Sequence, residues 1–528
     1  MSTAQPYPRP DFQRSELKWE SLNGPWDFLF DDDNVGLVQE WSKFGLPNSF
    51  SVAVPKDDAS QHHSAGNDSI LQKVASGTQE FLQNNTLIAS SSSRVNKKQE
   101  ITVPFVFQCP ASGINERGVH EVFWYERTIQ DPRSAEDKKL ERRVLLRFGA
   151  IDYEATIFVD DHYFGIHTGG HVPIELDITH ALDAVDVDGK GDGLMSHRIT
   201  IRVFDSAHDL TQPRGKQYWG AKPESIFYTP SGGIWQNVWL EVVPLSRIGD
   251  SSYGTVLKSN DILGGKLTGT IAVAGYAKGQ NLSVEVESSF AGGVIARFGP
   301  KALGVGGNKV EFAVNMRLTE EQRTKVSHDE LTGTDLSDDN IWRDGVALWS
   351  PEYPQLYDIT LRVLSSSGKV LDEVHTTAGM RSIDWTGDDG YWRLNGKPYF
   401  QALCLDQGYW PDTFMTPPSQ ESLKTDIEIA KRMGLNGCRK HQKVEDPAFY
   451  YWADRLGYLV WAEMANAYQF SHEYVRKFNR EWAMSVMLAI NHPSVVTWTP
   501  VNETWGYPEL KDNIEQQDHI RSLYFMTK

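Results

Sequence analysis

Short segments of alternating apolar and polar residues fill the chain from its start to about Pro244. Alternation with a period of two, repeated at intervals of roughly 8–12 residues between turn signals, is typical of the strands of a β-sandwich. The clearest examples are 122–129 (VFWYERTI), 143–151 (RVLLRFGAI), 155–161 (ATIFVDD) and 198–205 (RITIRVFD). We therefore predict that residues 1–244 form an N-terminal β-sandwich domain.

The segment 56–100 interrupts this pattern. It is rich in Ser, Gln, Asn, Lys and His, and its apolar residues are scattered, so it cannot bury a continuous face. Segments longer than about 15 residues without a pattern of their own are uncommon inside a compact domain. We predict that 56–100 is a disordered insertion or a long surface loop.

A second series of alternating segments covers residues 245–383. Examples are 266–277 (KLTGTIAVAGYA), 281–290 (NLSVEVESSF) and 308–318 (NKVEFAVNMRL). The spacing is again roughly one strand every 8–12 residues, which predicts a second sandwich of the immunoglobulin-like kind.

After about Asp384 the pattern changes to alternating strands and helices. The predicted strands are the short apolar runs 399–406, 436–441, 458–464 and 495–503. The predicted helices are one that follows Pro417-Pro418 and stops at Gly434, one with Asp446 as N-cap and Pro447 at its first position, and one over 471–490. Such units predict a parallel sheet, either part of a (β/α)₈ barrel or an open doubly wound sheet.

Polar residues stand at the carboxyl ends of all four predicted strands. They are Asp406, Arg439, Glu463 and the pair Asn502-Glu503. In a barrel these ends surround the active site, whereas a nucleotide-binding sheet carries a Gly-rich phosphate turn after its first strand. The corresponding turn, 405–412 (LDQGYWPD), is not Gly-rich. The sequence therefore favours a partial (β/α)₈ TIM barrel of about four βα units over 384–528.

Charge and cysteine content exclude several classes of function. The formal net charge is −18, from 52 basic and 70 acidic residues, which argues against nucleic acid or an anionic membrane as a partner because phosphate binding needs a basic surface. Cys109, Cys404 and Cys438 are widely spaced, so neither a disulfide framework nor a metal site is expected. With no apolar run of about 18 residues and no apolar leader, we expect a cytoplasmic protein.

Several motifs, in their order along the chain, resemble glycoside hydrolase family 2, which includes β-galactosidases, β-glucuronidases and β-mannosidases. They include LNGPWDF (22–28), GGIWQNVWLE (232–241), LWSPEYPQLYDI (348–359), YYWADRLGYLVW (450–461) and NHPSVVTWTPVNETWG (491–506). The resemblance covers nearly the whole chain. It implies a sugar-binding-like sandwich, an immunoglobulin-like domain and a catalytic barrel, which together hydrolyse a terminal β-linked sugar by a retaining mechanism.

The resemblance also implies roles for the Asn-Glu pair. In the family, the Glu that closes barrel strand four is the acid/base, so Glu503 takes that role, and Asn502 matches the Asn that binds the sugar 2-hydroxyl. A general acid must keep its proton until the glycosidic oxygen leaves, and a hydrogen bond to the 2-hydroxyl strengthens as the oxocarbenium-like state forms. The family's nucleophile closes strand seven, on the order of a hundred residues further on. Because the sequence ends at Lys528, we expect this chain alone to be inactive.

Other residues are candidates for substrate binding. We predict this role for Arg439, Asp406, Glu463 and Trp410, although structural pairing explains Arg439 and Glu463 almost as well. The loop 212–220, with Arg214 and Trp219, could form one side of the substrate cleft. The strand-two segment Arg439-Lys-His-Gln lacks the family's Arg-x-Ser-His pattern, which puts galactose and glucuronate in doubt as substrates.

Neither a metal nor another cofactor is expected, and the only partner that the sequence implies is a carbohydrate substrate. It does not indicate an oligomeric state. Two alternatives stay open from the sequence. One is a non-catalytic carbohydrate-binding or interaction protein that uses its two sandwiches, and the other is a truncated, inactive gene product.

Overall fold

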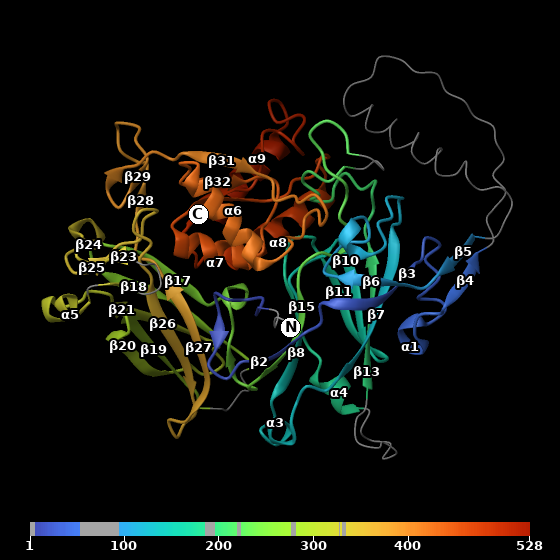
Figure 1. Cartoon of the computed structure of the whole chain (residues 1–528), viewed down its shortest axis with the longest axis horizontal. Coiled ribbons are helices and arrows are strands. Elements are labelled where there is room, and N and C mark those ends of the chain that lie inside the picture. Colours follow the sequence, from blue (N-terminus) through green and yellow to red (C-terminus); the bar gives the residue numbers. More distant parts are fainter. Residues whose placement is uncertain are drawn as a thin grey trace.

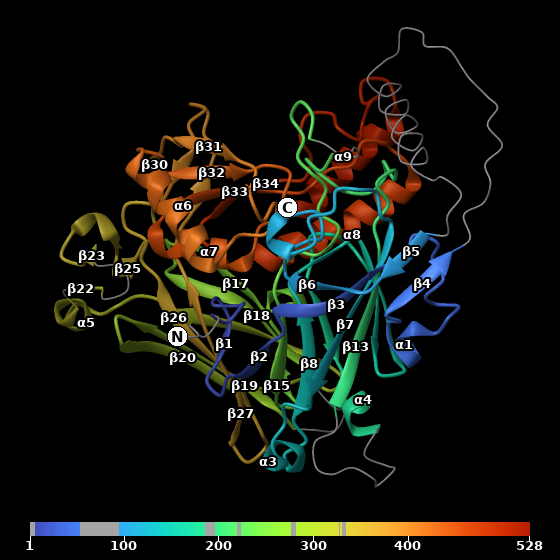
Figure 2. The same ribbon diagram turned by 45° about the vertical axis from the view of Figure 1, so that its right-hand side comes forward.

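The structure, a computed structural model, describes residues 6–52, 94–184, 196–218, 223–275, 281–326, 328–329 and 334–528, with the backbone alone at 52, 94, 328 and 329. Two regions consist mainly of antiparallel strands, and a third combines parallel strands with helices (Figures 1 and 2). In both views the third region lies against the other two. The protein is multidomain and is built mostly of β-sheets.

Two antiparallel sheets form the first region. Their side chains meet in one buried cluster, with Phe28 and Phe123 from the larger sheet and Leu146 and Leu240 from the smaller one. The larger sheet has the order β11 (His162–Thr168), β10 (Glu154–Val159), β13 (Ser196–Phe204), β7 (Val122–Gln130), β3 (Gly24–Phe30) and β6 (Gln99–Val103). The smaller sheet has the order β12 (Ile174–Asp177), β8 (Arg143–Phe148), β15 (Val238–Val243) and β2 (Lys18–Ser21). The predicted strands near 122, 143, 155 and 198 are therefore confirmed.

Short elements complete this region. They are α1 (Trp41–Phe44), α3 (Ala135–Lys139), α4 (Thr179–Ala184), the 3₁₀ turn η1 (Pro110–Ser112) and the strand pairs β4 (Ser49–Val52) with β5 (Arg94–Lys97) and β9 (Ile151–Asp152) with β14 (Gly233–Ile234).

The predicted insertion 56–100 extends too far at its C-terminal end. Residues 53–93 lie outside the described residues, but 94–97 form β5 and 99–103 form β6. Ile101 and Val103 of β6 are buried in the cluster between the two sheets. This strand is hard to recognise in the sequence because it begins with polar residues, and its two apolar positions, Ile101 and Val103, come only at its end.

The second region also consists of two antiparallel sheets. One has the order β1 (Gln13–Arg14), β27 (Val370–Ala378), β26 (Tyr357–Leu364), β19 (Ser283–Phe290) and β20 (Gly293–Ala302). The other has the order β16 (Arg247–Ile248), β18 (Lys266–Ala274) and β17 (Val256–Asp261), and β21 (Lys309–Asn315) pairs with β18. Alternate residues of both sheets, such as Val286, Val310 and Leu361, meet in one core. The strand β1 comes from the start of the chain, so the N-terminal residues lie in the sheet of the second region.

Short elements surround these sheets. They are α5 (Glu320–Lys325), the 3₁₀ turns η3 (Ser251–Tyr253) and η4 (Asp339–Ile341), and the strand pairs β22 (His328–Asp329) with β23 (Thr334–Asp335) and β24 (Trp342–Arg343) with β25 (Val346–Ala347). Three two-residue strands, β28 (Ile383–Asp384), β29 (Arg393–Leu394) and β30 (Lys397–Pro398), lead into the third region.

The third region contains a four-stranded parallel sheet. Its order is β31 (Leu403–Asp406), β32 (Gly437–Lys440), β33 (Leu459–Glu463) and β34 (Val495–Thr499), the same as the order along the chain. Its helices are α6 (Gln420–Arg432), α7 (Pro447–Leu456), α8 (His472–Ala489) and α9 (Ile514–Thr527). Among the described residues, no helix combines the length and the apolar character that crossing a membrane requires.

Local sequence signals explain where these helices begin and end. Asp446 caps α7 by accepting a hydrogen bond from the Ala448 N–H, Pro447 fills the first position, and Gly457 ends the helix with φ 68°. These are the favoured residues at those positions, because the first helical N–H groups need acceptors and the left-handed C-cap conformation favours glycine. The caps predicted for α7 are confirmed.

Candidate active site

The carboxyl ends of the four parallel strands lie at one edge of the sheet. β31 ends at Asp406, β32 at Lys440, β33 at Glu463 and β34 at Thr499. The pairing places Asp406 beside Lys440 and Glu463 beside Thr499. Functional side chains gather at this edge of a parallel sheet because the loops that follow the strands start there.

Arg439 connects two of the candidate residues. Its Nε donates to Glu463 Oε2 at 2.5 Å, and its Nη2 donates to Asn502 Oδ1 at 2.6 Å. The other oxygen of Glu463 accepts the Gln442 N–H at 3.0 Å and lies 2.9 Å from His441 Nδ1. The Glu463 side chain is fully buried, whereas 28% of the Arg439 side chain is exposed. Arg439 therefore fixes the orientation of both a buried carboxylate and the Asn502 amide.

Glu503 does not lie at a strand end. The strand predicted over 495–503 ends at Thr499, because Pro500 follows and has no N–H to continue the ladder. Glu503 instead begins a turn, with φ 53°, and its side chain is exposed. Positive φ is uncommon for a residue other than glycine. Within the described parts of the chain, no hydrogen bond to its carboxylate is found, and the charge of Lys216 lies nearby.

A loop of the first region reaches this edge. The N–H groups of Arg214 and Gly215 both donate to the Asn466 carbonyl, at 3.2 and 2.9 Å. Gly215 has φ 59°, and a Cβ atom there would lie 2.4 Å from the Gln442 carbonyl oxygen. Only glycine allows this approach of the two backbones. Arg214 itself donates to the carbonyls of Ser206 and Ala207, at 2.6 and 2.8 Å, and so stabilises its own segment.

Lys216, in the same loop, is a residue of this site that the sequence analysis did not single out. It is buried, and its Nζ lies 4.5 Å from the centre of the Trp505 ring. Burial lowers the pKa of Lys216 and the charge of Arg439 lowers it further, whereas the nearby carboxylates of Glu503 and Glu463 oppose this shift. Its place directly after Gly215 and two residues before Tyr218 was the available signal in the sequence, but only the fold shows which carboxylates lie near it. Trp219 lies outside the described residues.

Asp406 belongs to a neighbouring cluster of charges. Its Oδ2 lies 2.7 Å from Lys440 Nζ, which is also 2.9 Å from Glu445 Oε2, and Lys443 Nζ lies 3.0 Å from the same oxygen. Burial alone would raise the pKa of Glu445, but the two lysine charges lower it to about 2. The structure therefore places Asp406 against Lys440, while Arg439 contacts Glu463 and Asn502.

Trp410 is also placed apart from the Arg439 group. Its backbone exchanges two hydrogen bonds with Phe414, at 2.9 and 3.0 Å, and its ring packs against the cluster formed by α6, α7 and the sheet. Its predicted role in substrate binding stays a prediction. Of the predicted residues, the structure brings Arg439, Glu463 and Asn502 together in direct contact.

Within the described residues, no group of three or more His, Cys, Asp or Glu side chains is arranged to hold a metal ion.

Comparison with known proteins finds similarity to one family of glycosidases. A model of the family described as "Glycosyl hydrolases family 2" matches residues 299–381, in the second region. A β-galactosidase from Thermoanaerobacter pseudethanolicus is 22% identical over 420 residues, and a putative β-glucuronidase from Formosa agariphila is 25% identical over 404. The predicted resemblance to family 2 is confirmed. These matches cover 78% and 76% of this chain but 49% and 42% of the two relatives, so the chain spans about half of their length.

The fold is similar to that of solved β-glucuronidase structures. A β-glucuronidase from Ruminococcus gnavus in complex with D-glucuronic acid matches with a TM-score of 0.65 at 17% identity, over 99% of this chain and 72% of that one. The structure of the same enzyme without ligand matches equally well, with a TM-score of 0.65. The two named relatives are glycosidases by their descriptions, and this chain is similar to them over about three quarters of its own length.

Proposed function

We propose that this protein is a family 2 β-glycosidase that hydrolyses a terminal β-linked sugar with retention of configuration and uses Glu503 as acid/base. The observation that carries the proposal is the contact of Arg439 with both Glu463 and Asn502, next to the turn that holds Glu503. In this proposal the parallel strands are half of a (β/α)₈ barrel, the first region is a sugar-binding-like sandwich, and the second is immunoglobulin-like.

Asn502 has the geometry to bind a sugar hydroxyl. Because its Oδ1 accepts a hydrogen bond from Arg439, its NH₂ group remains as a donor. A donor fixed in this way can stabilise charge that develops on the hydroxyl as the glycosidic bond breaks. Glu503, the residue after Asn502, protonates the leaving oxygen and later takes a proton from the attacking water.

A retaining mechanism also needs a nucleophilic carboxylate about 5–5.5 Å from the acid/base. Glu463 does not suit this role, because Arg439 holds one of its oxygens and the Gln442 N–H holds the other. We assign Glu463 to positioning Arg439. The nucleophile is expected on a later strand of a complete barrel, as in the family.

The test starts with the native protein from its source, whose intact mass is compared with the 59.6 kDa of this chain. Nitrophenyl and alkyl β-glycosides of galactose, glucuronic acid and mannose are then assayed. Glu503→Gln is expected to reduce kcat/KM for the alkyl glycosides by roughly 10²–10⁴-fold. The loss should be smaller for nitrophenyl glycosides, because nitrophenolate leaves without protonation.

Glu509→Gln is the matched control, since Glu509 is an exposed carboxylate six positions further on. It should keep full activity. Equal activity of the two variants, or an equal loss on both substrate types, would exclude Glu503 as the acid/base. Saturable sugar binding by residues 1–383 without hydrolysis by the native protein would favour the binding-protein alternative.

A further inference from the structure

Two of the three cysteines lie side by side in the parallel sheet. Cys404 of β31 and Cys438 of β32 are paired residues in the register of the two strands, although they are far apart along the chain. Neighbouring strands lie about 4.7–4.9 Å apart, and a disulfide joins residues whose Cα atoms are roughly 4.4–6.8 Å apart. The strand pairing therefore holds both Cα atoms at a separation that a disulfide spans. In the structure both residues are free thiols.

The two side chains point to the same face of the sheet. Both cysteines pack in the cluster that the sheet forms with α6 and α7. Side chains alternate along a strand, so Arg439, the residue after Cys438, points to the opposite face. The Cys404 Sγ lies 3.5 Å from the Tyr458 hydroxyl and 3.9 Å from the carbonyl oxygen of Gly437, the residue before Cys438. The two thiols can therefore meet without either side chain crossing the sheet.

The two thiols differ in their access to solvent. Cys404 is half-buried and lines a cavity of about 300 Å³, together with Tyr409 and Asp426. Cys438 is fully buried, and this burial raises the pKa of its thiol well above the ordinary value. Because the thiolate is the nucleophile, an enclosed and protonated thiol reacts slowly with a reagent from solution. A small oxidant therefore reacts with Cys404 first.

We propose that Cys404 and Cys438 form a reversible disulfide, in which Cys404 reacts first and Cys438 closes the bond. The oxidant is a small-molecule disulfide. The Cys404 thiolate attacks one sulfur of the reagent, the S–S bond of the reagent breaks, and the departing thiolate takes up a proton. The Cys438 sulfur then gives its proton to water and attacks Cys404 Sγ, which releases the second half of the reagent as a thiol. The two cysteines lose two electrons and two protons, and the reagent gains them.

The bond joins the first two strands of the parallel sheet. Within the described residues, β31 is an edge strand that pairs with β32 alone. The backbone hydrogen bonds set the strand spacing, whereas an ideal disulfide brings its Cβ atoms to about 3.5–4.5 Å, so the bond forms under strain. Strained disulfides are the more easily reduced ones. The pair is therefore expected to switch between its two states, and it does so independently of Glu503 and of catalysis.

Exchange of the folded, full chain with hydroxyethyl disulfide at about pH 8, near the ordinary pKa of a thiol, tests this proposal. Free thiols, titrated after denaturation, should fall from three to one per chain, and the intact mass should fall by two hydrogen atoms. Trypsin should then release residues 394–424 joined to residues 433–439, because these peptides carry Cys404 and Cys438. Dithiothreitol should restore all three thiols.

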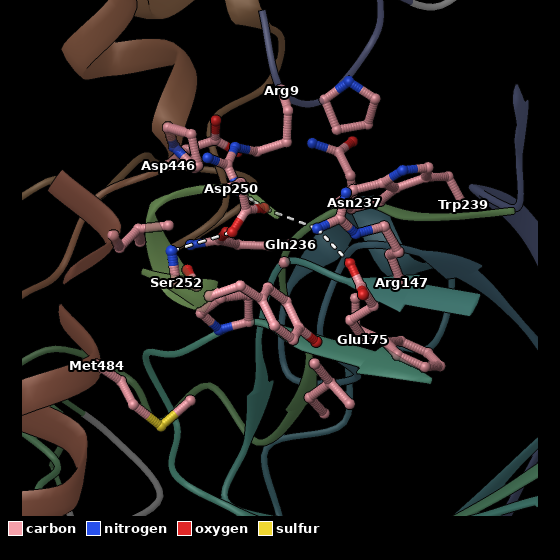
Figure 3. A pocket seen from close by; sticks show the side chains of 18 residues that line it. Arg9, Arg147, Glu175, Gln236, Asn237, Trp239, Asp250, Ser252, Asp446 and Met484 are labelled. Atoms are coloured by element: carbon pink, nitrogen blue, oxygen red, sulfur yellow. Dashed lines mark hydrogen bonds and ion pairs between the residues drawn. The ribbon is translucent and has the colours of Figure 1, made fainter. Parts of the chain in front are cut away.

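Methionine sulfur does not disturb this measurement. Figure 3 shows the thioether of Met484 at another cavity, where the three regions meet. A disulfide reagent leaves thioethers unchanged, whereas a peroxide would oxidise them to sulfoxides and add mass. The change in mass therefore reports the thiols alone.

Three variants separate the roles of the cysteines. Cys404→Ser should stop the reaction, and Cys438→Ala should leave one half of the reagent attached to Cys404. Cys109→Ser is the matched control and should form the cross-link unchanged, because Cys109 is buried in a different cluster, with Trp235 and Phe414. The proposal is wrong if all three thiols persist, if Cys438→Ala still loses two hydrogen atoms, if the cross-link involves Cys109 or joins two chains, or if dithiothreitol does not reverse it in the folded protein.

Discussion

Replacing Arg439 with methionine tests how much the candidate site depends on one guanidinium. The change leaves Glu463 fully buried with the Gln442 N–H as its remaining backbone donor. Removing one partner of a buried ion pair costs about 3–5 kcal/mol, because the other charge stays out of water without compensation. Since Arg439 is partly exposed, and Glu463 keeps the Gln442 N–H and the neighbouring His441 Nδ1 at 2.9 Å, we expect about 3 kcal/mol, at the lower end of that range.

Calorimetry of the full chain measures this effect. For a cooperative unit of about 150–250 residues, a loss of this size lowers Tm by roughly 6–12 °C. The control is the double variant Arg439→Met/Glu463→Met, which replaces both charges with apolar groups of similar size and should recover most of the loss. Our account of the pair is refuted if the single variant unfolds within 1 °C of the original protein, or if the double variant is as unstable as the single one.

Two further predictions concern the third region. Burial raises the pKa of Glu481 from 4.5 to about 7, despite the hydrogen bond that it accepts from Tyr153 at 2.9 Å. Because the folded-state pKa is the higher one, the folded chain holds this proton more tightly and loses up to about 3 kcal/mol of stability between about pH 4.5 and 7. Glu481→Gln should therefore match the original protein near pH 5 and exceed it in Tm near pH 8, and a difference that is independent of pH would contradict this reasoning. On α6, Ile427→Ala should lower the free energy of unfolding in urea by about 2–5 kcal/mol, because Ile427 is 1% exposed. Ile429 is 41% exposed, so Ile429→Ala should lower it by under about 0.5 kcal/mol. Equal losses for the two variants would mean that α6 packs differently.

The strands and capped helices could be predicted because their signals are local. The alternation around Val122 and the cap at Asp446 need no knowledge of distant residues. The end of β34 could also have been predicted, since Pro500 cannot donate a hydrogen bond to a sheet ladder. The apolar residues before and after Pro500 instead favoured a longer strand.

The contacts within the site could not be predicted in the same way. Arg439 has a carboxylate within reach on a neighbouring strand, so its pairing with Glu463 was foreseeable from strand order. The pairing of Asp406 with Lys440, and the approach of Lys216 from a region more than 200 residues earlier, depend on side-chain directions and domain packing. A single sequence carries no local signal for either.

The N-terminal residues have a consequence for the order of assembly. Arg14 forms an ion pair with Asp372, 358 residues away, and Gln420 donates to the Tyr7 carbonyl at 3.1 Å. At about 5–20 residues per second, a ribosome needs roughly 18–72 s to make the chain between Arg14 and Asp372. The segment around Arg14 is therefore made long before its partner, and a pause in translation before Asp372 leaves it exposed to proteases and chaperones.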